Sequence, residues 1–137
     1  MNWKLVLYLS VFGVAMGVAS LFGLTGRAEP LLWLLIFLFY AWIIATQAPG
    51  KYFLHGFLVS VLNGIWISII HSAFFATYVQ NNPQMQANLA ALPKGIDPRL
   101  LNLVFGPLIG AITGIVAGLL AWIAAKVLNK RSSVSRT

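Results

Sequence analysis

The residues best suited to chemistry in this chain are a few polar side chains in the otherwise apolar stretch 53–79. Asn63 and His71 are the strongly polar ones, and on a helix both fall within about 60° of Ser60. Polar groups at membrane depth mark functional sites because their exposure to hydrocarbon is costly. Asn and His also form ordinary hydrogen bonds between packed helices. The sequence therefore predicts either an intramembrane polar site at Ser60, Asn63 and His71 or, as the favoured alternative, a set of interhelical contacts, with His71 partly hydrated.

Several chemistries are excluded by the spacing and supply of reactive groups. On a helix Asn63 and His71 are about 12 Å apart and His55 and His71 about 24 Å apart, so neither pair can chelate one metal ion. The chain has no cysteine, and its two acids, Glu29 and Asp97, fall in predicted loops outside the spans. We therefore expect no catalytic residues, no metal site, no cofactor and no enzymatic activity. A proton-coupled multidrug exporter with four helices would carry a carboxylate inside a span, and none is expected. His55 is expected to be solvated near the cytoplasmic interface.

The polar residues are positioned by apolar segments of membrane-spanning length. Hydrophobic residues make up 60 % of the 137 positions, charged residues 8 %, and the mean hydropathy is +0.88. A helix of about 20 apolar residues crosses a bilayer. The first apolar block also fits a secretory signal peptide, but we expect it to be kept as a helix. The sequence predicts one all-α transmembrane domain over 1–137, with four helices at about 5–24, 31–48, 53–79 and 101–127, an outer segment 80–99 and a basic tail 128–137.

Charge and loop length indicate the topology. With four spans, six basic residues fall on the side of both termini and three on the other side. The excess predicts cytoplasmic termini, and the short connections predict an antiparallel bundle. The net charge of +7 is scattered between apolar blocks, which argues against a nucleic-acid partner. We expect a multi-pass protein of the bacterial inner (plasma) membrane.

The outer segment and the last helix carry two further signals. Asn82–Pro83 is typical of a helix start. Met85, Leu89 and Leu92 would share one face of a short helix on the outer interface, although a loop folded over the bundle is an equal alternative. The last helix is expected to begin near Asp97–Pro98 and to kink at Pro107.

Glycines recur at helical spacing in the first and fourth apolar blocks. In lipid, small residues let helix backbones approach closely, so these glycines predict helix-packing faces. We expect the first and fourth helices to contact each other and the second helix, which has no glycine, to face lipid. The faces suit the inside of one four-helix bundle, which is favoured, or the interface of a homo-oligomer. The packing residues are Gly13, Gly17, Gly106, Gly110, Gly114 and Gly118.

A family resemblance rests on the third and fourth blocks. The stretches YFLHGFLVSVLNGIWISIIHSAFFATYVQNNPQMQ and PLIGAITGIVAGLLAWIAAKVL resemble an uncharacterised family of short four-helix bacterial membrane proteins, a domain of unknown function. The resemblance implies a four-helix architecture and no activity.

Two functions remain from these observations. The first is a structural or interaction subunit of the membrane, which associates through glycine-mediated packing with itself or with a larger complex. The second is a channel or transporter for a small solute or ion, built as an oligomer around Asn63 and His71. Beyond these partners, only the lipid bilayer is expected.

Overall fold

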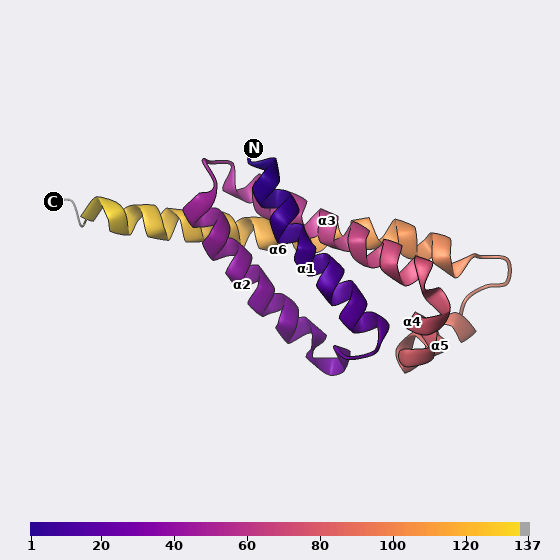
Figure 1. Cartoon of the computed structure of the whole chain (residues 1–137). Coiled ribbons are helices and arrows are strands. Elements are labelled where there is room, and N and C mark those ends of the chain that lie inside the picture. The colour runs from indigo at the N-terminus through magenta and orange to yellow at the C-terminus, as the bar shows by residue number, and fades with distance from the viewer. Residues whose placement is uncertain (135–137) are drawn as a thin grey trace.

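A computed structural model describes residues 1–134, with side chains described for residues 1–129. The described chain is helical and contains no strand, and four of its helices are long and apolar enough to cross a membrane. This confirms the all-α class and the four membrane-type helices. They are α1 (Trp3–Leu21), α2 (Glu29–Gln47), α3 (Tyr52–Ala73) and α6 (Pro98–Val134), and the short elements are η1 (Gly26–Ala28), α4 (Phe75–Asn81) and α5 (Pro83–Ala90) (Figure 1).

The third apolar block is divided where one helix was expected. α3 ends at Ala73, and Phe74 has φ −109° and ψ 41°, outside the helical region. α4 then folds back toward the end of α1, where the side-chain amide of Asn82 donates to the Ser20 carbonyl at 2.9 Å. The hydrophobic length of the block could not reveal this turn, because it depends on contacts with α1.

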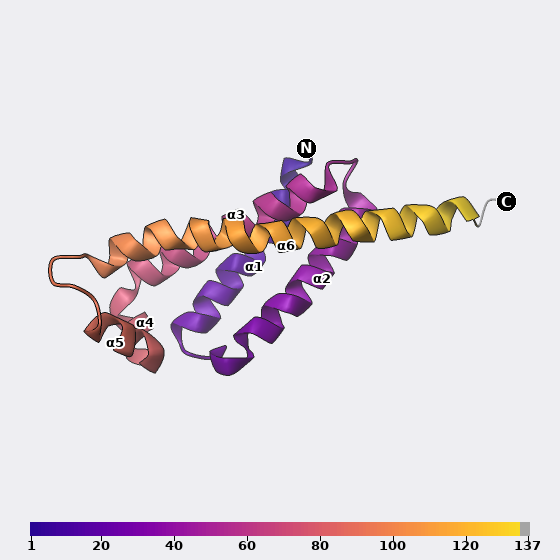
Figure 2. The same ribbon diagram turned by 180° about the vertical axis from the view of Figure 1, so that it is seen from behind.

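The short helix expected after Asn82 is present as α5, which carries Met85 and Leu89 but ends at Ala90, before Leu92. All three side chains are less exposed than the residues between them. α6 begins at Pro98 and continues across Pro107. The kink expected at Pro107 is not apparent, since α6 shows no sharp bend in Figure 2. α3 packs on both sides of that proline, against Gly106 and Gly110, and this supports a straight helix axis.

The helices do not pair as the glycine pattern predicted. α6 lies along α3 and also contacts α2, whereas α1 packs mainly on α3 and makes a smaller contact with α2 (Figures 1 and 2). The expectation that the first and fourth helices pair closely is therefore wrong. α2 is not simply a lipid-facing helix either, because its Tyr40 and Ile44 are fully buried. The buried core cluster consists of Leu5, Val6, Leu9, Phe37, Tyr40, Ile44, Ala48, Val59, Ala117 and Ala121.

The glycines explain why α3 is the central helix. A Cβ atom added at Gly110 would lie 2.7 Å from the Ser60 carbonyl oxygen, and one at Gly118 would lie 2.7 Å from that of Phe53. α3 returns the same contact, since a Cβ at Gly56 would lie 2.6 Å from the Ala117 oxygen. Gly13 of α1 meets α3 equally closely. The glycine faces of α1 and α6 thus both pack on α3, within one chain.

Candidate functional site

Asn63 ties three helices together near the centre of the molecule. It is 2 % exposed. Its Oδ1 accepts from the backbone N–H of Gly13 in α1 at 3.0 Å, and its Nδ2 donates to Tyr40 Oη in α2 at 2.9 Å. The Tyr40 hydroxyl in turn donates to the Leu9 carbonyl in α1 at 3.0 Å. The Asn63 side chain is therefore occupied on both its donor and its acceptor side.

The two backbone groups of α1 in this network are a natural pair. In an α-helix, the N–H of Gly13 would bond to the carbonyl of Leu9, four residues earlier. Here each of them also has a partner from another helix. Among the described residues, no buried side-chain nitrogen or oxygen lacks a hydrogen-bond partner. This arrangement is the interhelical contact that the favoured interpretation of the polar stripe describes.

Ser60 and His71 make separate contacts, so the three residues of the stripe do not form one site. Ser60 Oγ lies 2.9 Å from Thr113 Oγ1 in α6. His71 Nε2 lies 2.7 Å from Ser20 Oγ in α1, and the His71 ring stacks on Tyr78 of α4 with 3.8 Å between centroids. Along α3, Ser60 therefore contacts α6, Asn63 contacts α1 and α2, and His71 contacts α1 and α4.

His55 departs from its expected place at the solvated interface. It is 0 % exposed. Its Nε2 accepts from the Asn2 backbone N–H at 3.0 Å, and its Nδ1 lies 3.0 Å from the Lys51 carbonyl. A neutral ring with its proton on Nδ1 satisfies both contacts. His55 fastens the start of α1 to the start of α3, a role that the single sequence does not reveal.

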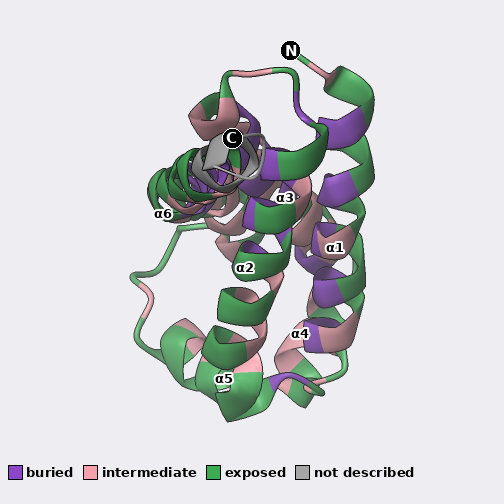
Figure 3. Ribbon diagram, turned by 90° about the vertical axis from the view of Figure 1, so that its left-hand side faces the viewer, coloured by how far each residue is buried: buried purple, intermediate pink, exposed green. Residues whose placement is uncertain are grey.

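A cavity of about 610 Å³ lies between the first half of α2, the second half of α3 and the first half of α6. We call it the groove. In this region α2 diverges from α6 (Figure 2), and much of the first half of α2 is exposed or half-buried (Figure 3). Apolar side chains supply most of its wall. The lining residues are Gly26, Glu29, Pro30, Trp33, Phe37, Ser60, Asn63, Gly64, Ile67, Ser68, His71, Tyr78, Asn102, Phe105, Gly106, Ile109, Gly110 and Thr113.

Glu29 is the single charged residue of that lining. It is the first residue of α2, and its Oε2 accepts from the Thr25 hydroxyl at 2.8 Å. Tyr78 also lines the groove, and burial together with the carboxylate of Glu29 raises its pKa above the usual value. Glu29 and Tyr78 therefore act on each other at one end of the groove, where His71 lies stacked on Tyr78.

The sequence interpretation missed the part of Glu29 and Trp33 in this groove, and it did not anticipate Tyr40 as a partner of Asn63. One signal was present for Glu29: Pro30 favours the first turn of a helix, which makes the preceding residue part of the helix start. Within the described residues, no three His, Asp or Glu side chains gather as metal ligands. Comparison of the chain with protein family models, curated proteins and solved structures finds no match.

Proposed function

We propose that the chain is an integral membrane protein with four antiparallel spans and both termini in the cytoplasm of a bacterial cell. The four long apolar helices support insertion. The distribution of Lys and Arg between the connections supports the orientation. In this topology η1, α4 and α5 lie on the outer side.

The topology can be tested with one reporter and one thiol, because the chain contains no native cysteine. A reporter fused after Thr137 is expected to be cytoplasmic. Gln86→Cys, on exposed α5, is expected to react with an impermeant maleimide in intact spheroplasts. If Gln86→Cys is labelled only in permeabilised cells, the orientation of the protein is the opposite of the proposed one.

We propose further that the protein is an interaction protein whose groove binds a lipid-like molecule taken from the membrane. The groove itself carries this proposal. Its volume of about 610 Å³ lies within the usual range of ligand pockets. Its wall combines apolar side chains such as Phe105 and Ile109 with polar groups along α3, and its charged group, Glu29, lies at one end. A molecule with an apolar chain and a polar head matches that distribution.

The same contacts argue against the other functions that the sequence left open. The glycines of α1 and α6 are engaged with α3 of the same chain, so they are not available to a second copy without rearrangement. Asn63 is engaged on both sides by Gly13 and Tyr40, so its amide already serves as a contact between helices without an ion or solute as partner. Both features favour a rigid scaffold that presents a groove.

Native mass spectrometry from lipid nanodiscs tests the proposal. Wild-type protein is expected as a monomer that retains a lipid-sized adduct. Ile109→Trp would fill the groove and is expected to lose the adduct. Ile112→Trp is the matched control, because Ile112 lies on the same helix, is 59 % exposed and does not line the groove.

Two results would contradict the proposal. Equal adduct retention in Ile109→Trp and Ile112→Trp would place the lipid elsewhere. A dimer that disappears in Ile109→Trp would show that a second copy, rather than a lipid, occupies the groove.

A further inference from the structure

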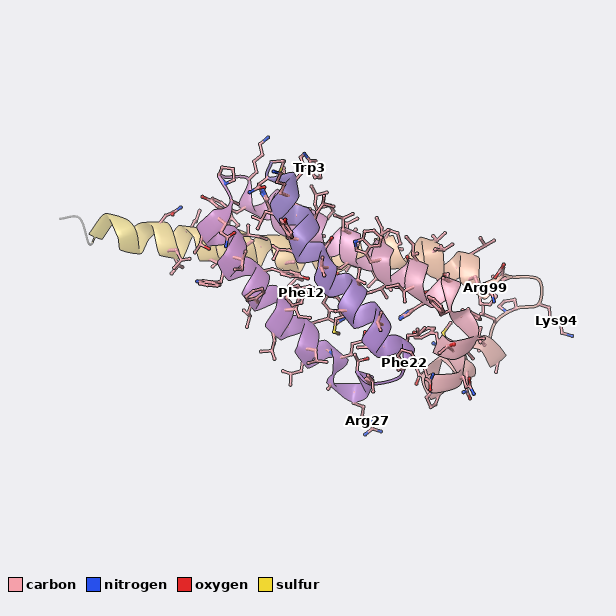
Figure 4. All side chains as sticks on the ribbon, in the orientation of Figure 1. Trp3, Phe12, Phe22, Arg27, Lys94 and Arg99 are labelled. Atoms are coloured by element: carbon pink, nitrogen blue, oxygen red, sulfur yellow. The ribbon has the colours of Figure 1, made fainter. Side chains whose placement is uncertain are left out.

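The charge of the groove is opposite to the charge of the chain. The chain has a formal net charge of +7, yet the charged lining residue of the groove is the acid Glu29. The basic residues near this end of the molecule are directed elsewhere. Arg27 and Lys94 point away from the helices (Figure 4), and the Arg99 guanidinium lies 5.6 Å from the Phe75 ring centroid. Within the described residues, Glu29 accepts a hydrogen bond from the Thr25 hydroxyl and makes no ion pair with a basic side chain.

Aromatic rings surround the same end of the groove. Trp33 lies one turn after Glu29 on α2. Tyr78 lies in the lining beside His71, and the ring planes of Tyr78 and His71 are 12° from parallel. Aromatic faces attract cations, most strongly when the cation is removed from water. A carboxylate beside aromatic rings therefore recognises an ammonium group by two mechanisms that act together.

We propose that the groove binds an amphiphile with a cationic ammonium head, whose head lies at Glu29 among Trp33, His71 and Tyr78. Its alkyl chain lies along the apolar wall toward Phe37 and Ile109. This inference rests on the proposed function, since it specifies the ligand of the same groove. It also adds a requirement that lipid binding alone does not have, namely discrimination by head-group charge.

A purely structural role for Glu29 makes a different prediction. Acidic residues stabilise the first turn of a helix through the helix dipole, and Thr25 holds the carboxylate in place. Loss of that role would lower stability without changing the preference among head groups. Head-group selectivity is therefore the measurement that separates ligand binding from helix stabilisation.

The test compares three ligands with the same tetradecyl chain: the trimethylammonium, the maltoside and the sulfate. Binding to the protein in zwitterionic nanodiscs is measured by isothermal titration calorimetry, with partition into empty nanodiscs subtracted. We expect the trimethylammonium to bind on the order of tenfold more tightly than the maltoside, and the sulfate to bind most weakly. The preference should weaken as salt is added.

Two matched variants assign the preference to Glu29. Glu29→Gln is expected to bring the affinities for the trimethylammonium and the maltoside within about twofold of each other. Asp97→Asn, which removes the other acid of the chain at an exposed position outside the groove, is expected to leave the tenfold preference unchanged. Maltoside affinity should be the same in wild type and Glu29→Gln.

The outcomes distinguish this inference from the proposed function. Equal binding of all three ligands in wild type, or preference for the sulfate, overturns the cationic head while groove binding stands. An Ile109→Trp variant that binds the maltoside as wild type does overturns groove binding itself. If Glu29→Gln fails to fold, the comparison of head groups in wild type still decides the question.

Discussion

Gly13→Ala tests the contact between α1 and α3. The added Cβ would lie 2.6 Å from the Asn63 Cα and 2.6 Å from its Oδ1. Carbon atoms in good contact are about 3.5–4.0 Å apart. The two helices would therefore have to separate locally by roughly 1 Å, and the hydrogen bond from the Gly13 N–H to Asn63 would lengthen by a similar distance.

The expected loss of stability combines two costs. Overpacking a tight contact typically costs about 1–3 kcal/mol. In the proposed membrane topology, the weakened hydrogen bond between the helices adds about 0.6 kcal/mol. Helix propensity acts in the opposite direction, since Ala is favoured over Gly in a helix by about 1 kcal/mol. We expect a net destabilisation of about 0.6–2.6 kcal/mol, opposite in sign to the effect of the same substitution in an exposed helix.

Gly17→Ala on the same helix is the control. Its Cβ would meet the flexible end of Ile70 at 3.0 Å and the Ile67 Cα at 3.4 Å, so a small side-chain movement accommodates it. We expect a change below about 0.5 kcal/mol after the gain in helix propensity. Unfolding by SDS in mixed micelles, followed by circular dichroism, measures both variants. If Gly13→Ala is as stable as Gly17→Ala, the close approach between Gly13 and Asn63 is not what holds α1.

Three further predictions follow from other contacts. Tyr40→Phe removes the hydroxyl between Asn63 and α1 and should cost about 1–2 kcal/mol; in a double-mutant cycle with Asn63→Leu the two losses should not add, and additive losses would refute the network. Gly114→Leu should lower the melting temperature in detergent, because a Cβ there already lies 2.9 Å from a backbone oxygen of α3, whereas Ile115→Leu should be nearly silent. The pKa of Tyr78 is raised in the folded protein. The contribution of its neutral hydroxyl to stability is therefore complete below the pKa of an unfolded tyrosine, about 10, and is lost as the pH rises through the folded pKa. Tyr78→Phe should reduce alkaline destabilisation above about pH 10, and an unchanged pH profile would refute the burial of this hydroxyl.

The positions of the long helices could be predicted from the sequence, but the pairing of these helices could not. Apolar length identified all four long helices, and Asn82–Pro83 identified the start of α5. The glycines indicated which faces pack closely, but a small-residue face fits any other close-packing surface. α3 also has glycines, Gly56 and Gly64, but the glycines of α1 and α6 recur every four residues, and this spacing suggested that α1 and α6 pair with each other.

The candidate site depended on contacts that have no local signature. Tyr40 is one aromatic residue among many on α2, and nothing near it in the sequence distinguishes it as the partner of Asn63. His55 likewise lies in an ordinary place for a solvated residue, and its burial depends on the position of Asn2. Glu29 was assigned to a loop because the helix was counted from its first apolar residues rather than from its cap.

The pairing of the helices has a consequence for the order in which the protein is assembled. α1 and α2 are synthesised first, but they pack less extensively on each other than on α3 and α6, which are their main partners. In the proposed membrane topology, the first hairpin can form the hydrogen bond from Tyr40 to the Leu9 carbonyl, but it lacks the contacts that Gly13 and Tyr40 both make with Asn63. In the proposed topology, α1 docks when α3 is inserted, and α2 gains its principal neighbour only when α6 follows. During biogenesis this protein is expected to remain loosely held at the insertion machinery until its final helix arrives, and a chain truncated before α6 is expected to be degraded rather than to accumulate as a stable three-helix intermediate.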